Sequence, residues 1–324
     1  MKEIGGFFEL ELNRGRMYHK NALAFNSGAN ALFFFFNNSD YQTVYLPYFT
    51  CDVVIDVAVQ LNLDIIFYRL DTSLRPIVDI SKLNDKTVLI YNNYFGICEE
   101  QIGKIARKTK HLIIDAAQAF YYIPKKNMSS FNSVRKFFGV PDGGFLYGFK
   151  PNTVKLYEQL NNTTYECNHL FKRHELGAQK SYLFFKQNEE VLINNPIGKM
   201  SHVTRALLAN VDFDIVKQSR INNFNTIHDY LASSNELKLG VVNGENVPLC
   251  YPYLCQNGDL LKQFLISKGV FVPTYWPNVK KLINDDSFFE VHLCENLVCL
   301  PIDQRYDFHE MRFIIETINR FEHA

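Results

Sequence analysis

Short apolar runs alternate with segments of helical spacing between about residues 25 and 150 of this 324-residue chain. The runs are continuously apolar, as in strands that are buried on both faces. They are Thr43–Pro47, Leu63–Leu70, Thr87–Tyr91, His111–Asp115 and Gly143–Phe149, and the helical segments between them are Ala29–Asn37, Cys51–Leu61 and Glu99–Lys108. This alternation predicts an α/β fold built on a large, mostly parallel sheet.

The second half of the chain has a different pattern. A long polar and helical region runs from Pro151 to Leu231, and a strand, helix, strand, helix pattern follows Pro248. In the last helix, Phe308 to Phe321, apolar residues recur on one face. We therefore predict two domains, a large α/β domain with its following helical region (residues 1–231) and a smaller α+β domain (residues 232–324).

The composition argues for a small-molecule partner. Lys plus Arg and Asp plus Glu are equal at 34 each, so there is no net basic charge to attract nucleic acid. The N-terminus does not resemble a signal peptide, and the longest apolar run, Ala31 to Phe36, is too short to span a membrane. The seven cysteines form no CxxC pair, which indicates free thiols and no metal site. We expect a soluble, cytoplasmic protein.

The segment "HLIIDAAQAF" places polar groups where a parallel sheet binds ligands. Asp115 ends an apolar strand and Gln118 follows three residues later. Ligands of such sheets lie at the carboxyl ends of the strands, and a buried acid there is costly unless it meets a cation. The alternative is that Asp115 only caps the following helix.

The segment "FNSGANAL" predicts an anion site at the start of a helix. Ser27, Gly28, Ala29 and Asn30 combine small side chains with free backbone amides, an arrangement that suits a phosphate. Here too the alternative is ordinary helix capping.

Lys136 lies in an apolar run six residues before Asp142, at the turn Asp142-Gly143-Gly144. A ring cofactor with an aldehyde and a phosphate needs one lysine to form an imine, one acid for the ring nitrogen and one amide nest for the phosphate. The chain offers all three, whereas a solvated surface lysine would not explain the apolar surroundings of Lys136.

These residues belong to a longer series of motifs that resembles a known family. "GGFFELEL", "SGANAL", "LPYFTC", "IIDAAQAF", "RKFFGVPDGG", "RINNFNTIHDYL", "YPYL" and "LPIDQRY" occur in the order found in the DegT/DnrJ/StrS-type sugar aminotransferases, which depend on pyridoxal 5'-phosphate (PLP). The match is to the shorter "RKFFGVPDGG" branch and covers nearly the whole chain. The resemblance implies the PLP-dependent transferase fold of aspartate aminotransferase, fold type I.

The resemblance also implies roles for individual residues. The family's imine-forming lysine precedes the Gly-Gly pair by seven residues, which selects Lys136 rather than Arg135. Asp115 would pair with the pyridine nitrogen of the cofactor, and Gln118 would reach its ring hydroxyl or lie against the ring.

Three positions depart from the family pattern. The phosphate-binding serine usually lies five residues before the lysine, but Ser130 lies six before Lys136, so either the turn differs by one residue or Ser133 takes the role. Ala29 replaces a threonine of the phosphate nest, which leaves Asn30 as its substitute. Cys51 stands where relatives stack an aromatic ring on the cofactor, and the nearby Tyr48 and Phe49 are candidates for that ring.

The resemblance therefore implies an aminotransferase that converts a keto sugar, nucleotide-linked, to an amino sugar for surface polysaccharide or related biosynthesis. The donor would be a glutamate-like amino acid, and the enzyme a homodimer. Two alternatives remain open. One is a related sugar dehydratase, against which Lys136 argues because those enzymes have histidine there. The other is a paralogue that binds PLP or a sugar nucleotide without turnover.

Overall fold

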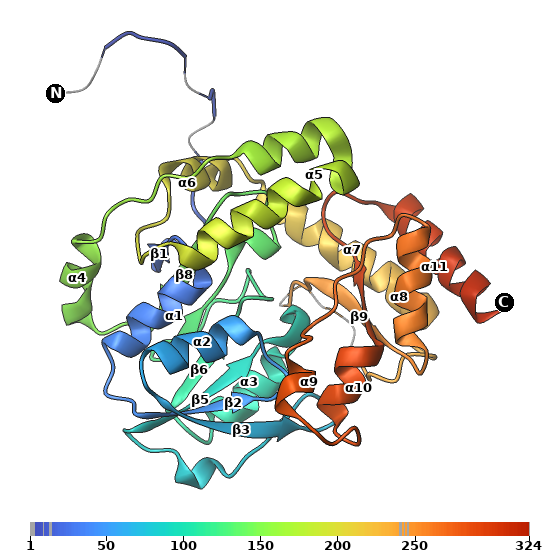
Figure 1. Cartoon of the computed structure of the whole chain (residues 1–324), viewed down its shortest axis with the longest axis horizontal. Coiled ribbons are helices and arrows are strands. Elements are labelled where there is room, and N and C mark those ends of the chain that lie inside the picture. The colour runs from blue at the N-terminus through green and yellow to red at the C-terminus, as the bar shows by residue number, and fades with distance from the viewer. Residues whose placement is uncertain are drawn as a thin grey trace.

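A computed structural model describes residues 4–8, 10–12, 15–239, 242, 244 and 246–323. Its main element is an eight-stranded sheet with the strand order β1-β8-β7-β6-β5-β2-β3-β4 (Figure 1). The strands are β1 (Leu23–Phe25), β2 (Thr43–Pro47), β3 (Asp64–Leu70), β4 (Pro76–Ile77), β5 (Thr87–Asn92), β6 (Leu112–Asp115), β7 (Ser129–Phe131) and β8 (Gly144–Tyr147).

Five neighbouring strands of this sheet, from β7 to β3, are parallel, while β1, β8 and β4 pair antiparallel to their neighbours. The five strands predicted from apolar runs are confirmed as β2, β3, β5, β6 and β8. The strands β1 and β7 were not predicted, because three residues each are too few to show a pattern. The carboxyl ends of the parallel strands meet at one edge.

Alternate residues of the central strands enter two different cores. In β5, Val88 and Ile90 pack with the cluster on the side of the first two helices, whereas Leu89 and Tyr91 pack into the cluster on the opposite face. Both faces of β5 are therefore buried, which explains why its sequence is continuously apolar.

Eleven α-helices are present in the described part of the chain, and four short 3-10 turns connect other elements. The helices are α1 (Gly28–Asn37), α2 (Asp52–Gln60), α3 (Glu99–Ala106), α4 (Val154–Glu158), α5 (Asn168–Asn194), α6 (His202–Ala209), α7 (Phe213–Leu231), α8 (Gly258–Ser267), α9 (Val279–Leu282), α10 (Phe289–Asn296) and α11 (Phe308–Glu322). The 3-10 turns are η1 (Ile80–Lys82), η2 (Tyr94–Gly96), η3 (Val134–Lys136) and η4 (Pro151–Thr153). Within the described residues, no helix is both long enough and apolar enough to cross a membrane.

The C-terminal part forms a second centre of packing, on the orange and red side of Figure 1. Its sheet pairs β9 (Cys250–Leu254) antiparallel with β10 (Leu297–Pro301), and both strands pack against α8 and α11. The predicted last helix is confirmed as α11, with Met311 and Ile318 fully buried. Residues of α7, which ends at Leu231, also pack into this core.

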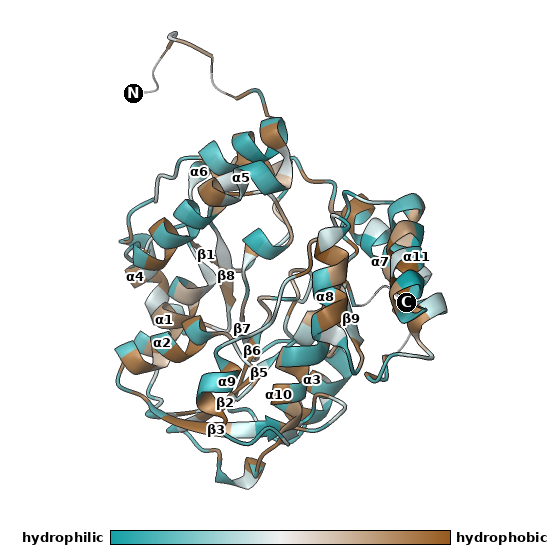
Figure 2. Cartoon of the chain, turned by 45° about the vertical axis from the view of Figure 1, so that its right-hand side comes forward, coloured by the Kyte–Doolittle hydropathy of each residue, from teal (hydrophilic) through white to brown (hydrophobic). Residues whose placement is uncertain are grey.

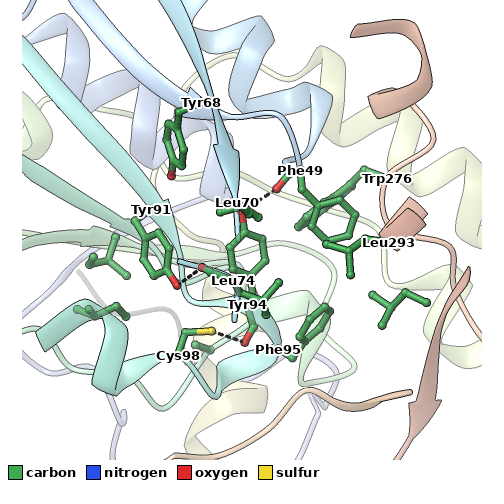
Figure 3. Close-up of a cluster of buried hydrophobic side chains, with 14 of the residues drawn as sticks. Phe49, Tyr68, Leu70, Leu74, Tyr91, Tyr94, Phe95, Cys98, Trp276 and Leu293 are labelled. Carbon is green, nitrogen blue, oxygen red and sulfur yellow. Dashed lines mark hydrogen bonds between the residues drawn. The ribbon is translucent and has the colours of Figure 1, made fainter. Parts of the chain in front are cut away.

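A buried aromatic cluster joins the C-terminal part to the large sheet (Figure 3). The hydroxyl of Tyr94 donates to the carbonyl of Phe49 at 2.9 Å, and the Phe49 ring lies 4.8 Å from that of Trp276. Trp276 precedes α9, so the loop between α8 and α9 is packed onto the carboxyl edge of the sheet.

Candidate functional site

A cavity of about 280 Å³ lies at the carboxyl ends of β5 and β6, beside the start of α1. Among the residues that line it are nine of the ten site residues predicted from the sequence: Ser27, Gly28, Ala29, Asn30, Cys51, Asp115, Gln118, Ser133 and Lys136. The tenth, Ser130, is buried within β7 opposite Tyr147 and does not line the cavity.

Asp115 occupies the end of β6, where it is the register partner of Asn92 at the end of β5. One carboxylate oxygen, Oδ1, accepts a hydrogen bond from the backbone N–H of Ala117 at 2.8 Å. Burial raises the pKa of Asp115, while the charge of Lys136 and the Ala117 N–H act in the opposite direction. A cation placed against this carboxyl would lower its pKa and keep it ionised.

Apart from Oε1 of Glu189, which is in the ion pair with Arg135, three buried polar atoms on cavity-lining residues have no hydrogen-bond partner within the described residues. They are Nε2 of Gln118, Oδ1 of Asn92 and Nδ2 of Asn93. The Gln118 side chain is held by its other end, because Oε1 accepts from the N–H of Phe95 at 2.9 Å. Unsatisfied buried polar atoms are costly, so a ligand with complementary donors and acceptors would stabilise this edge.

The start of α1 provides backbone donors to the same cavity. Ser27 is the N-cap, and its Oγ accepts from the N–H of Asn30 at 3.0 Å. The N–H groups of Gly28 and Ala29 have no partner among the described residues, as is usual in a first helical turn. The Asn30 side chain is engaged elsewhere, because its Nδ2 donates to Oδ1 of Asn26 at 2.8 Å.

Two glycines press the start of α1 against the turn that contains Lys136. A Cβ at Gly28 would lie 2.7 Å from the carbonyl oxygen of Asn132, and a Cβ at Gly144 would lie 2.6 Å from the backbone nitrogen of Gly28. Only glycine permits these approaches. They place the free amides of α1 and the lysine on adjoining walls of one cavity.

Lys136 ends η3 and projects an ammonium that forms no hydrogen bond or ion pair within the described residues. Its Nζ lies 5.7 Å from the centre of the Tyr275 ring. The neighbouring cation is engaged instead, because Arg135 forms an ion pair with Glu189 of α5. Burial lowers the pKa of Arg135 to about 10.

The turn after Lys136 is fixed by Asp142, which is fully buried. Its carboxylate accepts hydrogen bonds from the N–H and Oγ of Ser201, at 2.9 and 2.7 Å, and from the hydroxyl of Thr204. Burial raises the pKa of Asp142, and the hydroxyl donors act against that shift. Asp142 therefore anchors the lysine turn to α6 rather than contributing to the cavity.

Cys51 lies in the cavity wall, at the N-cap of α2. Burial raises the pKa of its thiol to about 11, so the side chain is a neutral thiol at physiological pH. The two aromatic candidates beside it do not line the cavity, because Tyr48 stacks on Phe67 and Phe49 packs on Trp276.

Sequence reasoning missed several residues of this cavity, among them two asparagines and a tryptophan. Asn92 and Asn93 follow β5 as Asp115 ends β6, so the rule that selected Asp115 also applies to them. Trp276 is the single tryptophan of the chain and lines the cavity from a remote segment. Within the described residues, no group of three or more His, Cys, Asp or Glu side chains could hold a metal ion.

Comparison with known proteins gives the fold. No family model and no curated protein matches the sequence. Among solved structures, a DegT/DnrJ/EryC1/StrS aminotransferase from Brucella abortus superposes with a TM-score of 0.64 at 16% identity, covering 93% of this chain and 85% of that one.

Two further structures agree. PseC from Helicobacter pylori, an aminotransferase of pseudoaminic acid biosynthesis, has a TM-score of 0.64 at 14% identity and covers 93% and 86% of the two chains. NtdA from Bacillus subtilis, with bound cofactor PMP, has a TM-score of 0.66 at 14% identity and covers 94% and 74%. The predicted fold class, the α/β fold of the PLP-dependent transferases, is confirmed.

Proposed function

We propose that this protein is a PLP-dependent sugar aminotransferase of the DegT/DnrJ/EryC1/StrS type. The supporting observation is that Lys136, Asp115 and the free amides at the start of α1 line one cavity at the carboxyl edge of the sheet. The likeness to aminotransferase structures over more than nine-tenths of the chain supports the same assignment.

The residues present fit PLP. The unpartnered N–H groups of Gly28 and Ala29, beside Ser133, suit its phosphate. Asp115 suits a protonated ring nitrogen, since a buried carboxylate needs a cation, and the free Nε2 of Gln118 suits a ring oxygen. When bound, PLP would supply an electron sink for the carbanion formed from an amino acid.

The chain's own contribution is proton transfer and orientation. Lys136 would provide the amine that holds the cofactor, and its Nζ would serve as the group that accepts and donates protons during the reaction. Its freedom from ion pairs within the described residues leaves the amine available, whereas a guanidinium such as that of Arg135 stays protonated. Trp276 lines this side of the cavity, and the ring of Tyr275 lies 5.7 Å from the Nζ of Lys136.

The acceptor in this proposal is a nucleotide-linked keto sugar, and the donor is glutamate or a similar amino acid. The product would be an amino sugar for surface polysaccharide or related sugar biosynthesis. PseC, which is structurally similar, is an aminotransferase involved in the biosynthesis of pseudoaminic acid. This supports a sugar acceptor for the present chain.

We further propose that the protein is a homodimer. Helix α5, which is kinked at Gly177, exposes several large apolar side chains along its length, a density that marks interaction surfaces. They are Phe171, Leu176, Tyr182, Leu183, Phe185, Val191 and Ile193. Figure 2 shows hydrophobic and hydrophilic residues mixed along this helix. Light scattering coupled to gel filtration should give twice the 37.7 kDa chain mass.

The decisive experiment is spectroscopic. The purified protein is loaded with PLP, freed of excess cofactor, and mixed with glutamate and then with a panel of nucleotide-linked keto sugars. An aminotransferase loses its yellow absorbance with glutamate and regains it with the correct acceptor. A protein that binds PLP but stays yellow with every amino donor would be a non-catalytic paralogue, and one that binds no PLP would refute the proposal.

A further inference from the structure

A second cavity, of about 700 Å³, adjoins the first on the other side of the turn that contains Lys136. The two cavities share Arg135 and Lys136 in their walls. The remaining walls of the second cavity come from α5, from α7 and from the loop that follows β10. A ligand group placed there would lie beside the proposed reaction centre without entering the cofactor cavity.

Arg220 of α7 is the most notable residue of this cavity, because it is only 1% exposed yet charged. Its Nε donates to Oε1 of Gln304 at 3.0 Å, and its Nη1 donates to the carbonyls of Leu249 and Pro248 at 3.0 and 3.2 Å. The guanidinium lies 4.5 Å from the centre of the Phe137 ring. Within the described residues, Nη2 has no hydrogen-bond partner and no carboxylate lies within ion-pairing distance.

The other charges of the cavity leave an excess of positive charge. Arg173 of α5 is exposed and forms no ion pair with any described residue, whereas Arg305 is already paired with Asp303 at 2.7 and 2.8 Å. Asp303 is the only carboxylate among the described residues that line the cavity, and the guanidinium groups of Arg305 and Arg220 lower its pKa against the effect of burial. The charge of Asp303 therefore acts on Arg220, but its carboxylate forms its ion pair with Arg305, which leaves Arg220 and Arg173 in excess over the one carboxylate of the cavity.

A buried guanidinium with no carboxylate within ion-pairing distance is unfavourable, and a bound anion would stabilise it. We propose that Arg220 and Arg173 form an oxyanion site that binds the anionic group of a substrate while another part of it reacts near Lys136. Both a phosphate of the nucleotide-linked acceptor and a carboxylate of the amino donor present this chemistry, and guanidinium groups bind either one through paired hydrogen bonds. The substrate assignment rests on the proposed function, but the anion site itself does not.

The test measures binding rather than turnover. Inorganic pyrophosphate and glutarate are titrated separately into the full chain by calorimetry at low salt, with and without saturating PLP. Three variants are compared with the wild type: Arg173→Gln, Arg220→Lys, and the matched control Arg107→Gln, which removes an exposed arginine outside this cavity. Arg220→Lys keeps the positive charge but removes the paired N–H donors of the guanidinium. The folding of this variant is checked by circular dichroism.

We expect one of the two anions to bind in the presence of PLP. Arg173→Gln should weaken that binding about 5- to 20-fold and Arg220→Lys at least about 10-fold, the range for lost charge-assisted hydrogen bonds, while Arg107→Gln leaves it unchanged. Tighter binding of pyrophosphate assigns the site to the acceptor, and tighter binding of glutarate assigns it to the donor.

Binding of neither anion, or equal binding by wild type and Arg173→Gln, would overturn the proposal. Because Arg173 is exposed, that variant remains informative even if Arg220→Lys fails to fold. Failure of the proposed function has a different signature. In that case PLP causes no absorbance change, while anion binding remains sensitive to Arg173 and Arg220.

Discussion

The ammonium of Lys136 and the ring of Tyr275, 5.7 Å apart, join the turn after β7 to the loop before α9 at the edge of the cavity. The lysine is thus adjacent to an aromatic face, and its charge acts on both Asp115 and Cys51. Lys136 is also the lysine that lines the cavity among the described residues, so it is the amine to test for a bond to a cofactor.

Replacing Lys136 and Arg135 in turn should show which of these two neighbouring cations forms the imine with PLP. After PLP loading and borohydride reduction, peptide mapping should find the pyridoxyl label on Lys136. Lys136→Ala should lose the label and lower turnover at least about 100-fold, because no other amine replaces the nucleophile and proton carrier. Arg135→Ala is the control and should keep the label. A label on a different lysine would contradict the assignment.

Asp115→Asn should preserve the fold and reduce turnover by at least about 100-fold, because an amide cannot hold the ring nitrogen protonated. The change keeps the side-chain shape and the acceptor for the Ala117 N–H. Single-turnover absorbance with glutamate measures the loss directly. A wild-type rate in this variant would mean that Asp115 only caps the segment after β6 and takes no part in the reaction.

Gly28→Ala should weaken PLP binding and also destabilise the fold by about 1–3 kcal/mol, since the new Cβ would meet the Asn132 carbonyl at 2.7 Å. Gly103→Ala in α3 is the matched control. Its Cβ would meet only Nη1 of Arg107, at 3.8 Å, so stability should be unchanged or rise by up to about 1 kcal/mol. Denaturant unfolding and PLP titration measure both effects. Unaltered PLP affinity in Gly28→Ala would place the phosphate elsewhere.

Trp276 should report on cofactor binding, because it is the only tryptophan and lines the cavity. PLP should quench its fluorescence in a saturable manner. Pyridoxal, which has no phosphate for the α1 amides, should require a much higher concentration for the same effect. Equal potency of the two compounds would argue against the phosphate site at Gly28 and Ala29.

Because His19 is buried, the protein should become less stable in mild acid. It is buried between the hydroxyl of Tyr147, at 2.9 Å from Nδ1, and the carbonyl of Phe120, at 2.6 Å from Nε2. Burial lowers its pKa from 6.5 to about 4. A histidine with a lowered folded-state pKa favours the native state above pH 6.5, and this contribution declines as the pH falls toward 4.

The free energy of unfolding should therefore fall by roughly 2 kcal/mol between pH 7.5 and 5 on account of His19 alone. Urea unfolding of the wild type and of His19→Gln, at both pH values, isolates this term. The wild type should lose more stability than the variant. Equal losses would assign the acid sensitivity to other groups.

Local patterns predicted the parts of the site that lie within one strand–helix unit. Asp115 and the α1 nest were found because a strand end and a helix start show in a few residues of sequence. Asn92 and Asn93 could have been found by the same rule. Trp276 could not, because its place beside Phe49 depends on how a loop more than 200 residues away packs onto the sheet.

Side-chain partners were likewise beyond local reasoning. Asn30 stays a predicted phosphate ligand and lines the cavity, but its Nδ2 also donates to the carbonyl of Pro196 at 3.4 Å, a partner 166 positions away that no local pattern shows. Ser130 and Ser133 could not be distinguished by counting, because the choice depends on where β7 ends. The strand ends at Phe131, which keeps Ser130 inside the sheet and leaves Ser133 at the cavity.

All eight strands of the large sheet lie between Leu23 and Tyr147, whereas Tyr275 and Trp276 lie more than 120 residues later. During synthesis, the sheet and the lysine turn leave the ribosome well before the loop that walls the cavity, and N-terminal units generally fold first. A chain arrested near residue 200 would therefore present an open, apolar-lined edge to chaperones. Full-length chains would cover that edge only when the last third arrives.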